Sequence, residues 1–358
     1  MSTPQKDELR VAVVGAGRMG SDHVDRLAHR THRARVSAVV DVDLDRASAV
    51  AASAVTSGIE GPVALPSIAE LLKAGTTDAV VLATPGVLHE EALLSLLDTG
   101  LPVLCEKPLT PDPASALRVV EAEVTGGRRL IQVGFMRHFD AGYRRLKETI
   151  ESGELGELLM LHHQHRNPVA PPEFDDAMII HDSAVHEFDA VRFFSGEEIT
   201  EVDVRIGRTS RRATPGLRDP QHLRLRTTSG LLADAEIFVN AQLGYQVHTQ
   251  ATFESGVVRI GEEATMLTTT EHRSSAEVHT GFVERFRDSY DSEVQQWVDA
   301  TRAEGSTGPS AWDGYAAATC CAAGVLSQRE ERAVAVEMVD QPSFYSRSQE
   351  HRMSGLAH

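Results

Sequence analysis

The feature that most constrains the fold is the segment GAGRMG at residues 15–20, which follows an apolar run over residues 9–14. Three glycines with this spacing, placed between a strand and a helix, are typical of a turn that binds a dinucleotide. Gly15 permits a tight turn, Gly17 lets the backbone approach a pyrophosphate, and Gly20 lets the helix pack closely on the strand. We therefore expect a pyrophosphate at the N-terminus of the following helix, where N–H groups attract anions.

An acidic residue follows the glycine turn at the distance expected for a ribose ligand. Asp41 lies 21 residues after Gly20, at the end of a second apolar run over residues 36–40. A carboxylate there can bind both ribose hydroxyls of NAD and would repel a 2′-phosphate. We expect NAD as the cofactor. NADP is less favoured but stays an alternative, because Arg18 or Arg46 can also reach a 2′-phosphate.

Strand-like and helix-like runs alternate through the first third of the chain. Ser67 is followed three residues later by Glu70, a capping-box spacing that predicts a short helix. Alternation of this kind predicts parallel βαβ units and a doubly wound sheet, and hence an α/β fold with an N-terminal Rossmann dinucleotide-binding domain over residues 1–134. Strands are expected over 9–14, 36–40, 79–83, 102–105 and 130–133, and helices over 18–29, 43–54, 88–98 and 114–124.

The pattern changes after Gly134. Between Ile199 and Ile260, apolar and charged residues alternate with a period of two, which predicts half-exposed, mostly antiparallel strands. We expect a second α/β domain over residues 135–358, with a large open sheet, that binds substrate and mediates oligomerisation. Helices are expected over 143–150, 181–194, 283–303 and 309–328, and an extended polar tail from about residue 341.

Composition narrows the class of partner. The net charge of −17 argues against a nucleic-acid partner, whose phosphates attract basic proteins, and favours a small neutral or cationic substrate. Three cysteines, at 105, 320 and 321, do not make a disulfide framework, so we expect a reducing compartment. No apolar run approaches the ~20 residues of a membrane span, and residues 1–8 do not resemble a signal peptide. These features predict a cytoplasmic protein with no membrane partner.

A second motif, Glu106-Lys107-Pro108, follows the buried-looking run 101–105. Its position at the carboxyl edge of the predicted sheet is where α/β proteins bind ligands. A cation at Lys107 would stabilise a developing alkoxide. Pro108 is compatible with a cis peptide bond. The competing interpretation is that Lys107 is an ordinary surface charge.

The third motif is HDSAVHEFD at residues 181–189. On an α-helix, Asp182, His186 and Asp189 would share one face, because they are spaced i, i+4 and i+7. An imidazole between two carboxylates is suited to act as a general base near neutral pH. Two other interpretations remain: a solvated helix face, or a metal site with further ligands from the run HHQH at 162–165. We expect no metal, because hydride transfer to NAD+ needs only a base and an electrophilic stabiliser.

Together these motifs resemble those of the Gfo/Idh/MocA oxidoreductase family, and the resemblance to its inositol 2-dehydrogenase branch is closer still. Four further segments extend it over nearly the whole chain. They are VGFMRHFD at 133–140, HRNP at 165–168, AEIFVN at 235–240 with GY at 244–245, and GPSAWDGY at 308–315.

The resemblance implies oxidation of a ring secondary alcohol of a polyol such as myo-inositol, hydride transfer to NAD+, and a homotetramer formed through the open sheets. It also implies roles for individual residues. Catalysis is expected from Lys107, Asp182 and His186; cofactor binding from Gly15, Gly17, Arg18, Met19, Gly20, Asp41, Thr84, Glu106 and Lys107; and substrate binding from Arg137, His165, Asn167, Asp182, His186, Asp189 and Tyr245.

The chain departs from the pattern of that branch at His138, Phe139 and His181, and in the segment 169–178 with its two acids, Asp175 and Asp176. Extra carboxylates raise the hypothesis of an amino-bearing cyclitol or sugar as substrate. Two alternatives therefore accompany the leading interpretation. One is a related cyclitol or sugar dehydrogenase, which includes a ketone reductase. The other is a non-catalytic NAD-binding sensor, which would have no need to keep Lys107, Asp182 and His186 together.

Overall fold

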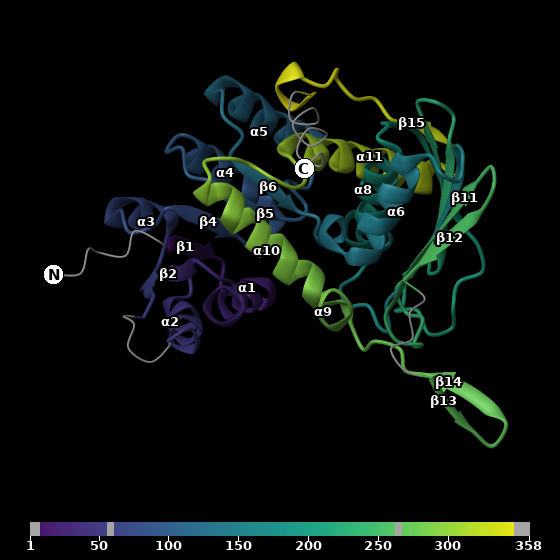
Figure 1. Ribbon diagram of the computed structural model, residues 1–358, viewed down its shortest axis with the longest axis horizontal. Helices are drawn as coiled ribbons and strands as arrows, with labels where there is room; N and C mark the ends of the chain where they lie inside the picture. Colours follow the sequence, from purple (N-terminus) through teal and green to yellow (C-terminus); the bar gives the residue numbers. More distant parts are fainter. Residues whose placement is uncertain (1–7, 56–60, 262–266, 347–358) are drawn as a thin grey trace. The chain divides into compact units, whose positions relative to one another are not determined.

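The computed structural model describes residues 8–55, 61–261 and 267–346, and these divide into two compact units (Figure 1). The first unit runs to Phe135 and also contains Tyr290–Tyr315 and the described residues from Val339 to Ser346. The second unit holds Met136–Ser289 and Ala316–Met338. The second unit is thus not continuous from residue 135 to the end, because two later segments return to the first.

The first unit is built on a six-stranded parallel sheet with the order β3-β2-β1-β4-β5-β6. Its central strand β1, with the sequence LRVAVV, is almost entirely buried, as expected where helices cover both faces of a parallel sheet. The α/β Rossmann prediction is therefore confirmed. The elements are β1 (Leu9–Val14), α1 (Arg18–His29), β2 (Ala34–Val40), α2 (Leu44–Ser53), β3 (Val63–Leu65), α3 (Ile68–Ala74), β4 (Ala79–Leu82), α4 (His89–Leu97), β5 (Val103–Glu106), α5 (Pro113–Gly126) and β6 (Ile131–Gly134).

Side-chain caps begin three of these helices. The carboxylates of Asp43 and Asp112 accept backbone N–H groups at the starts of α2 and α5, and the Ser67 hydroxyl accepts from Glu70 N–H at the start of α3. The Ser67 cap was predicted from its spacing. The short edge strand β3 was not predicted. Helix α10 (Arg287–Arg302) also contributes to this unit, since its Val294, Trp297 and Val298 side chains join the core beside β1.

The second unit is built on a seven-stranded sheet with the order β12-β11-β7-β10-β9-β8-β15. Strands β7 and β10 are parallel, and the other neighbours are antiparallel, so the predicted mostly antiparallel sheet is confirmed. Its elements are α6 (Ala141–Ser152), β7 (Leu158–Arg166), α7 (Asp176–Met178), α8 (Val185–Ser195), β8 (Ile199–Ile206), β9 (Gln221–Thr227), β10 (Leu232–Phe238), β11 (Gln246–Phe253), β12 (Val257–Ile260), β13 (Leu267–Thr270), β14 (Arg273–Ala276), α9 (Phe282–Arg285) and β15 (Val334–Ala335), and α11 (Ala311–Glu330) ends in it.

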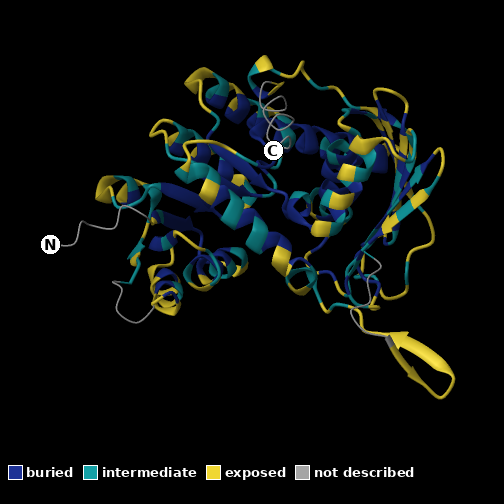
Figure 2. Cartoon of the chain, in the orientation of Figure 1, coloured by how far each residue is buried: buried dark blue, intermediate teal, exposed yellow. Residues whose placement is uncertain are grey.

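The strands of this sheet alternate between a covered and an open face, as Figure 2 shows. In β9, Leu223 and Leu225 are buried, whereas Arg224 and Arg226 are exposed. Helices cover one face: Gly324 of α11, for example, leaves room for Val202 of β8. The described part of the β13–β14 hairpin is exposed (Figure 2).

Two expectations need correction. The region 181–194 is not one α-helix, because a π-helical turn at Ile179–Ala184 precedes α8. The polar segment from residue 341 is not simply extended, because Tyr345 is buried and its hydroxyl donates to Glu123 at 2.7 Å. None of the helices in the described ranges has the length and apolar content needed to cross a membrane.

Candidate active site

The glycine turn of the first unit has the geometry that a pyrophosphate site requires. Gly15 has a φ of 99°, and its N–H donates to the Val40 carbonyl at 2.7 Å. A Cβ atom at Gly15 would lie 2.6 Å from the Ala83 oxygen, and one at Gly20 would lie 1.7 Å from the Gly15 oxygen. A Cβ atom at Gly17, by contrast, would meet no atom of the described chain within 4 Å. Open space therefore lies beside Gly17, directly before the N-terminus of α1.

The first two residues of α1 complete this half of the predicted cofactor site. Arg18 is exposed and Met19 is half-buried. Both belong to the first turn of α1, where backbone N–H groups lack partners within the helix. A dinucleotide in the open space would therefore meet these N–H groups.

Asp41 lies at the end of β2 and binds the glycine turn directly. Its Oδ2 accepts the N–H of Ala16 at 2.7 Å, and its Oδ1 accepts Asp43 N–H at 2.9 Å and Arg46 Nη2 at 2.6 Å. Burial disfavours the charged form of Asp41, but the hydrogen bonds from Arg46 and the two backbone N–H groups outweigh it and hold the pKa below its ordinary value. The turn thus carries a fixed negative charge at neutral pH.

Thr84 and Lys107 lie just beyond the carboxyl ends of neighbouring strands β4 and β5. The Thr84 hydroxyl oxygen is buried and has no hydrogen-bond partner among the described residues, which is the situation that a bound ligand would satisfy. Lys107 is half-buried, and its peptide bond to Pro108 is cis. The buried ring of His89 joins the two strand ends, since Nε2 lies 2.8 Å from the Thr84 carbonyl oxygen and Nδ1 lies 2.9 Å from that of Pro108.

In the second unit, the predicted catalytic motif spans the π-helical turn and α8. Asp182 lies in the π turn and is exposed, whereas His186 and Asp189 lie in α8 and are buried. A π turn closes i to i+5 hydrogen bonds, so the α-helical spacing that placed Asp182 on one face with the other two does not apply across it. It does apply to His186 and Asp189, which are neighbours at i and i+3.

A buried ionic cluster, which we call the Glu187 cluster (Arg137, His165 and Glu187), adjoins this motif. Glu187 Oε1 accepts Arg137 Nη1 at 2.6 Å, and Glu187 Oε2 lies 3.2 Å from His165 Nδ1. Burial raises the pKa of Glu187, but the charges of Arg137 and His165 outweigh burial and lower it to about 2. Arg137 and His165 were expected as substrate residues; Glu187 was not. The signal for Glu187 was its position among the apolar residues Val185 and Phe188, where a carboxylate needs a partner.

His138, one of the departures from the branch pattern, binds the other acid of the motif. Its Nε2 lies 2.9 Å from Asp189 Oδ2, and its ring lies 4.1 Å from that of Phe193, measured between ring centroids. Asp189 Oδ1 is buried and has no hydrogen-bond partner among the described residues. Asp189 therefore keeps one acceptor atom available for a ligand hydroxyl.

Several expected substrate residues lie together. The His165 ring lies 6.3 Å from the His186 ring and 5.8 Å from the Tyr245 ring, between centroids. Asn167 follows β7 directly and is half-buried, with its N–H donating to the Phe238 carbonyl. The second unit thus gathers His165 of β7, His186 of α8 and Tyr245, which directly precedes β11.

The histidine side chains of the run 162–165 lie on both faces of the sheet. Because side chains alternate along β7, His163 and His165 are buried on the covered face while His162 pairs with Asp234 at 2.6 Å on the open face. His163 contacts the Thr249 hydroxyl at 3.0 Å, and burial lowers its pKa to about 4. In the described ranges, no group of three or more His, Cys, Asp or Glu side chains is arranged to hold a metal ion.

Comparison with known protein families gives one match in each of the two units. A model of the oxidoreductase family with an NAD-binding Rossmann fold matches residues 9–135, and a model of the GFO/IDH/MocA C-terminal domain matches residues 143–259. Inositol 2-dehydrogenase of Pseudarthrobacter chlorophenolicus is 55% identical over 340 residues, which cover 95% of this chain and 99% of that protein. Inositol 2-dehydrogenase of Renibacterium salmoninarum is 52% identical over 349 residues, covering 94% of this chain and 100% of that protein.

One of the similar solved structures was determined with its ligands. It is myo-inositol dehydrogenase from Lactobacillus casei in complex with NAD(H) and myo-inositol, with a TM-score of 0.90 and 33% identity. This match covers 94% of this chain and 99% of that chain. The chain therefore belongs to the GFO/IDH/MocA family of oxidoreductases, whose N-terminal part is an NAD-binding Rossmann fold.

Proposed function

We infer that this protein is an NAD-dependent inositol 2-dehydrogenase, which oxidises a ring secondary alcohol of myo-inositol to a ketone. The observation that carries this inference is the match at 55% identity to an inositol 2-dehydrogenase over 95% of the chain. The similar Lactobacillus casei structure, with its NAD(H) and myo-inositol, supports the same cofactor and substrate class.

NAD suits the first unit for three reasons. Space is open beside Gly17, the Thr84 hydroxyl is buried without a partner in the described chain, and the Asp41 carboxylate is held in its charged form. Arg46 is engaged by Asp41, so it is not offered to a 2′-phosphate. When bound, NAD+ accepts a hydride from the carbinol carbon of the substrate. The residues proposed to hold it are Gly15, Gly17, Arg18, Met19, Gly20, Asp41, Thr84, Glu106 and Lys107.

Three side chains are proposed to handle the proton of the reacting hydroxyl. His186 accepts this proton as general base, a role for which imidazole is suited near neutral pH. Asp182 stabilises the imidazolium that results, and the Lys107 ammonium stabilises negative charge on the reacting oxygen. The exposed position of Asp182 in a π turn supports this assignment, because π-helical segments inside helices are frequent at functional sites.

The other hydroxyls of the ring are assigned to residues of the second unit. Asp189 Oδ1 supplies an acceptor, and His165, Asn167 and Tyr245 supply further polar groups. Arg137 serves indirectly, since its side chain is 1% exposed and its guanidinium pairs with Glu187. We therefore propose that Arg137 orients His165 rather than contacting the substrate.

The hypothesis of an amino-bearing substrate has less support than that of a plain polyol. Asp175 caps α7 by accepting Met178 N–H at 2.8 Å, and Asp176 pairs with Arg218 at 2.6 Å. Both carboxylates that suggested it are thus engaged within the protein. A plain polyol remains the best-supported substrate class.

The direct test is NADH formation at 340 nm with NAD+ and a panel of myo-inositol, scyllo-inositol, D-chiro-inositol, glucose and an amino-cyclitol. We expect clear turnover of myo-inositol. Turnover of another member alone would keep the reaction class but overturn the substrate. Silence across the panel with intact NAD binding would favour the sensor alternative.

We further propose that the protein works as a cytoplasmic homotetramer assembled through the open face of the seven-stranded sheet. That face carries cross-strand charge pairs, among them Arg166 with Glu236 at 2.6 Å, which suit a polar, self-complementary contact. The buried free thiols of Cys105, Cys320 and Cys321 fit a reducing compartment. Light scattering after gel filtration should give four times the 38.9 kDa chain mass, and a monomer would contradict the assembly.

A further inference from the structure

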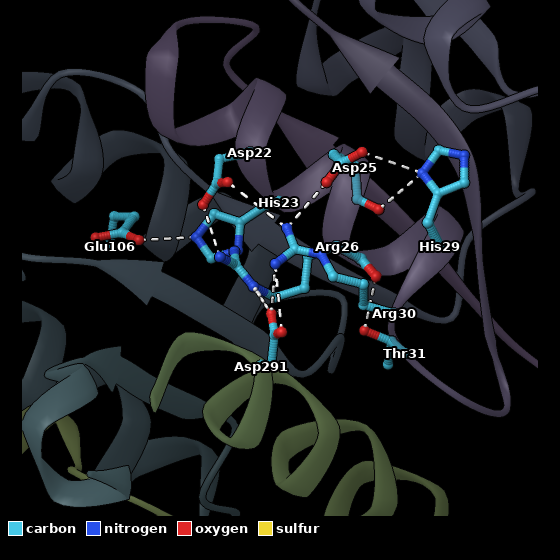
Figure 3. A network of polar contacts seen from close by, with 9 residues as sticks. All are labelled: Asp22, His23, Asp25, Arg26, His29, Arg30, Thr31, Glu106 and Asp291. Carbon is cyan, nitrogen blue, oxygen red and sulfur yellow. Dashed lines mark hydrogen bonds and ion pairs between the residues drawn. The ribbon is translucent and has the colours of Figure 1, made fainter. Parts of the chain in front are cut away.

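The residue before Lys107 is held by the helix that starts at the glycine turn. Glu106 is buried at the end of β5, and its Oε1 lies 2.7 Å from Nε2 of His23, which is in α1 and fully buried (Figure 3). The other oxygen, Oε2, accepts the backbone N–H of Lys107 at 3.3 Å. On the neighbouring strand β6, Gly134 lies so close that a Cβ atom there would be 3.3 Å from Glu106 Oε2. The carboxylate of Glu106 is thus held by two hydrogen bonds and packs closely against Gly134.

The protonation of the His23 ring follows from its other neighbour. The guanidinium of Arg26 lies 3.4 Å from His23 Nδ1, measured from Nη1. An arginine side chain can only donate, so Nδ1 must accept, and the ring proton is on Nε2. His23 therefore donates an N–H directly to Glu106.

Arg26 is itself fixed in this orientation. Its Nη2 donates to Asp22 at 2.7 Å, its Nε donates to Asp291 of α10 at 2.7 Å, and its side chain is fully buried (Figure 3). The guanidinium also lies over the Tyr290 ring, 5.1 Å from the centroid. Because both carboxylates hold Arg26, the tautomer of His23 is set by the fold of the first unit.

We propose that His23 is a positioning residue for the dehydrogenase reaction. By holding the Glu106 carboxylate against the N–H of Lys107, it fixes the backbone from which the Lys107 side chain extends. The helix that presents its N-terminus to the dinucleotide thereby also orients the cation that acts on the substrate oxygen. Glu106 has the same positioning role, because one of its oxygens contacts His23 and the other accepts the N–H of Lys107. This inference rests on the proposed role of Lys107.

The test separates positioning from mere stability. His23→Leu removes the donor, whereas His23→Gln keeps an N–H near the position of Nε2. His29→Gln is the matched control, because His29 lies in the same helix but is exposed and contacts only Asp25 in the described structure. We expect H23L to lower kcat with myo-inositol by roughly 10- to 100-fold, the cost of misplacing a reacting group by about 1 Å. The KM for NAD should change less than threefold, H23Q should recover most of the loss, and H29Q should match wild type.

A second readout does not depend on activity. The chain has four lysines, at 6, 73, 107 and 147, so reductive ¹³C-methylation gives few signals, and K107R identifies that of Lys107. We expect the Lys107 signal to shift in H23L and to stay in place in H23Q. If H23L does not fold, H23Q must still match wild type in kcat and in this signal, whereas His23→Asn, which is too short to reach Glu106, must not.

Unchanged kcat and an unchanged Lys107 signal in folded H23L or H23N would overturn the proposal. Equal losses in H23Q and H23L would do the same. If wild type turns over no inositol, the proposed function fails, yet the NMR comparison still decides whether His23 orients Lys107.

Discussion

The carboxylate of Glu187 and the guanidinium of Arg137 form an ion pair at 2.6 Å within the second unit, with both side chains 1% exposed. The second oxygen of Glu187 reaches His165, whose ring lies beside that of His186. A fully buried pair of this kind is costly to break, because the remaining partner becomes an uncompensated charge. The pair therefore holds the polar residues of the proposed substrate site in one arrangement.

Replacing Glu187 by glutamine should destabilise the protein by about 3–5 kcal/mol, because the buried Arg137 charge would lose its counterion. Urea unfolding followed by circular dichroism measures this. The matched control is Glu151→Gln, since Glu151 is half exposed and, among the described residues, pairs with Lys147 one helical turn away; it should cost less than about 0.5 kcal/mol. Equal effects of the two substitutions would contradict the role given to the buried pair.

The same pair predicts a pH dependence. The pKa of Glu187 is about 2 in the folded protein and 4.5 ordinarily, so the unfolded chain takes up the proton first as pH falls. The stabilisation is fully present above about pH 5 and is lost as pH falls from there towards 2. The stability difference between wild type and E187Q should therefore shrink between pH 5 and pH 3.5, and a difference independent of pH would refute this assignment.

Asp41→Ala should weaken NAD far more than NADP. The substitution removes the carboxylate proposed for the ribose hydroxyls and frees Arg46, which Asp41 now holds at 2.6 Å. The KM for NAD should rise roughly tenfold or more, because one to two hydrogen bonds to a charged group are lost, while NADP turnover should improve. Equal losses for both cofactors would show that Asp41 supports only the turn. Asp41→Ala combined with Arg46→Ala should abolish the gain with NADP.

His138→Leu should raise the KM for inositol about tenfold, because it leaves the buried Asp189 carboxylate without its hydrogen bond from His138. The kcat should change less than threefold, because the substitution leaves the proposed base, His186, in place. His138→Gln keeps a donor and should recover most of the affinity. Steady-state kinetics of the two variants make this comparison. An unaltered KM in folded H138L would exclude His138 from substrate recognition.

Tyr345→Phe should destabilise the first unit by about 1–3 kcal/mol, since it leaves Oε2 of the buried Glu123 without its 2.7 Å donor. Thermal unfolding of Y345F beside that of Ser346→Ala, an exposed neighbour, isolates the effect. Similar melting temperatures for the two variants would show that the hydroxyl contributes little.

Much of the first unit was predictable because its signals are local. The run 9–14 and the helix 18–29 have the predicted bounds, since a buried apolar strand, a glycine turn and an amphipathic helix each leave a distinct pattern. The position of Asp41 at the end of β2 was also predicted from spacing, whereas its hydrogen bond to Ala16 in the glycine turn was not. Strand β3 was missed because three half-exposed residues at a sheet edge form no period.

The remaining features depend on tertiary contacts. Nothing in the residues 179–184 distinguishes a π turn from an α-helix, so the α-helical spacing from which the shared face of Asp182 and His186 was predicted does not hold there. His23 resembles an ordinary helix polar residue until its partner, Glu106, is known. Glu187 carries only the signal of its apolar neighbours, which does not identify Arg137 as its partner. Tyr345 likewise stands in a polar tail, and only its contact with Glu123 shows that it is anchored.

The most direct test of the central claim is the rate of NADH formation at 340 nm from myo-inositol and NAD+ by wild type and by His186→Ala. We predict clear turnover by wild type and a kcat lower by roughly 10²–10⁴ in the variant, the contribution of a general base, with NADH binding unchanged. A near-wild-type kcat in H186A would contradict the assignment of the base. Absence of turnover by wild type would contradict the inferred reaction itself.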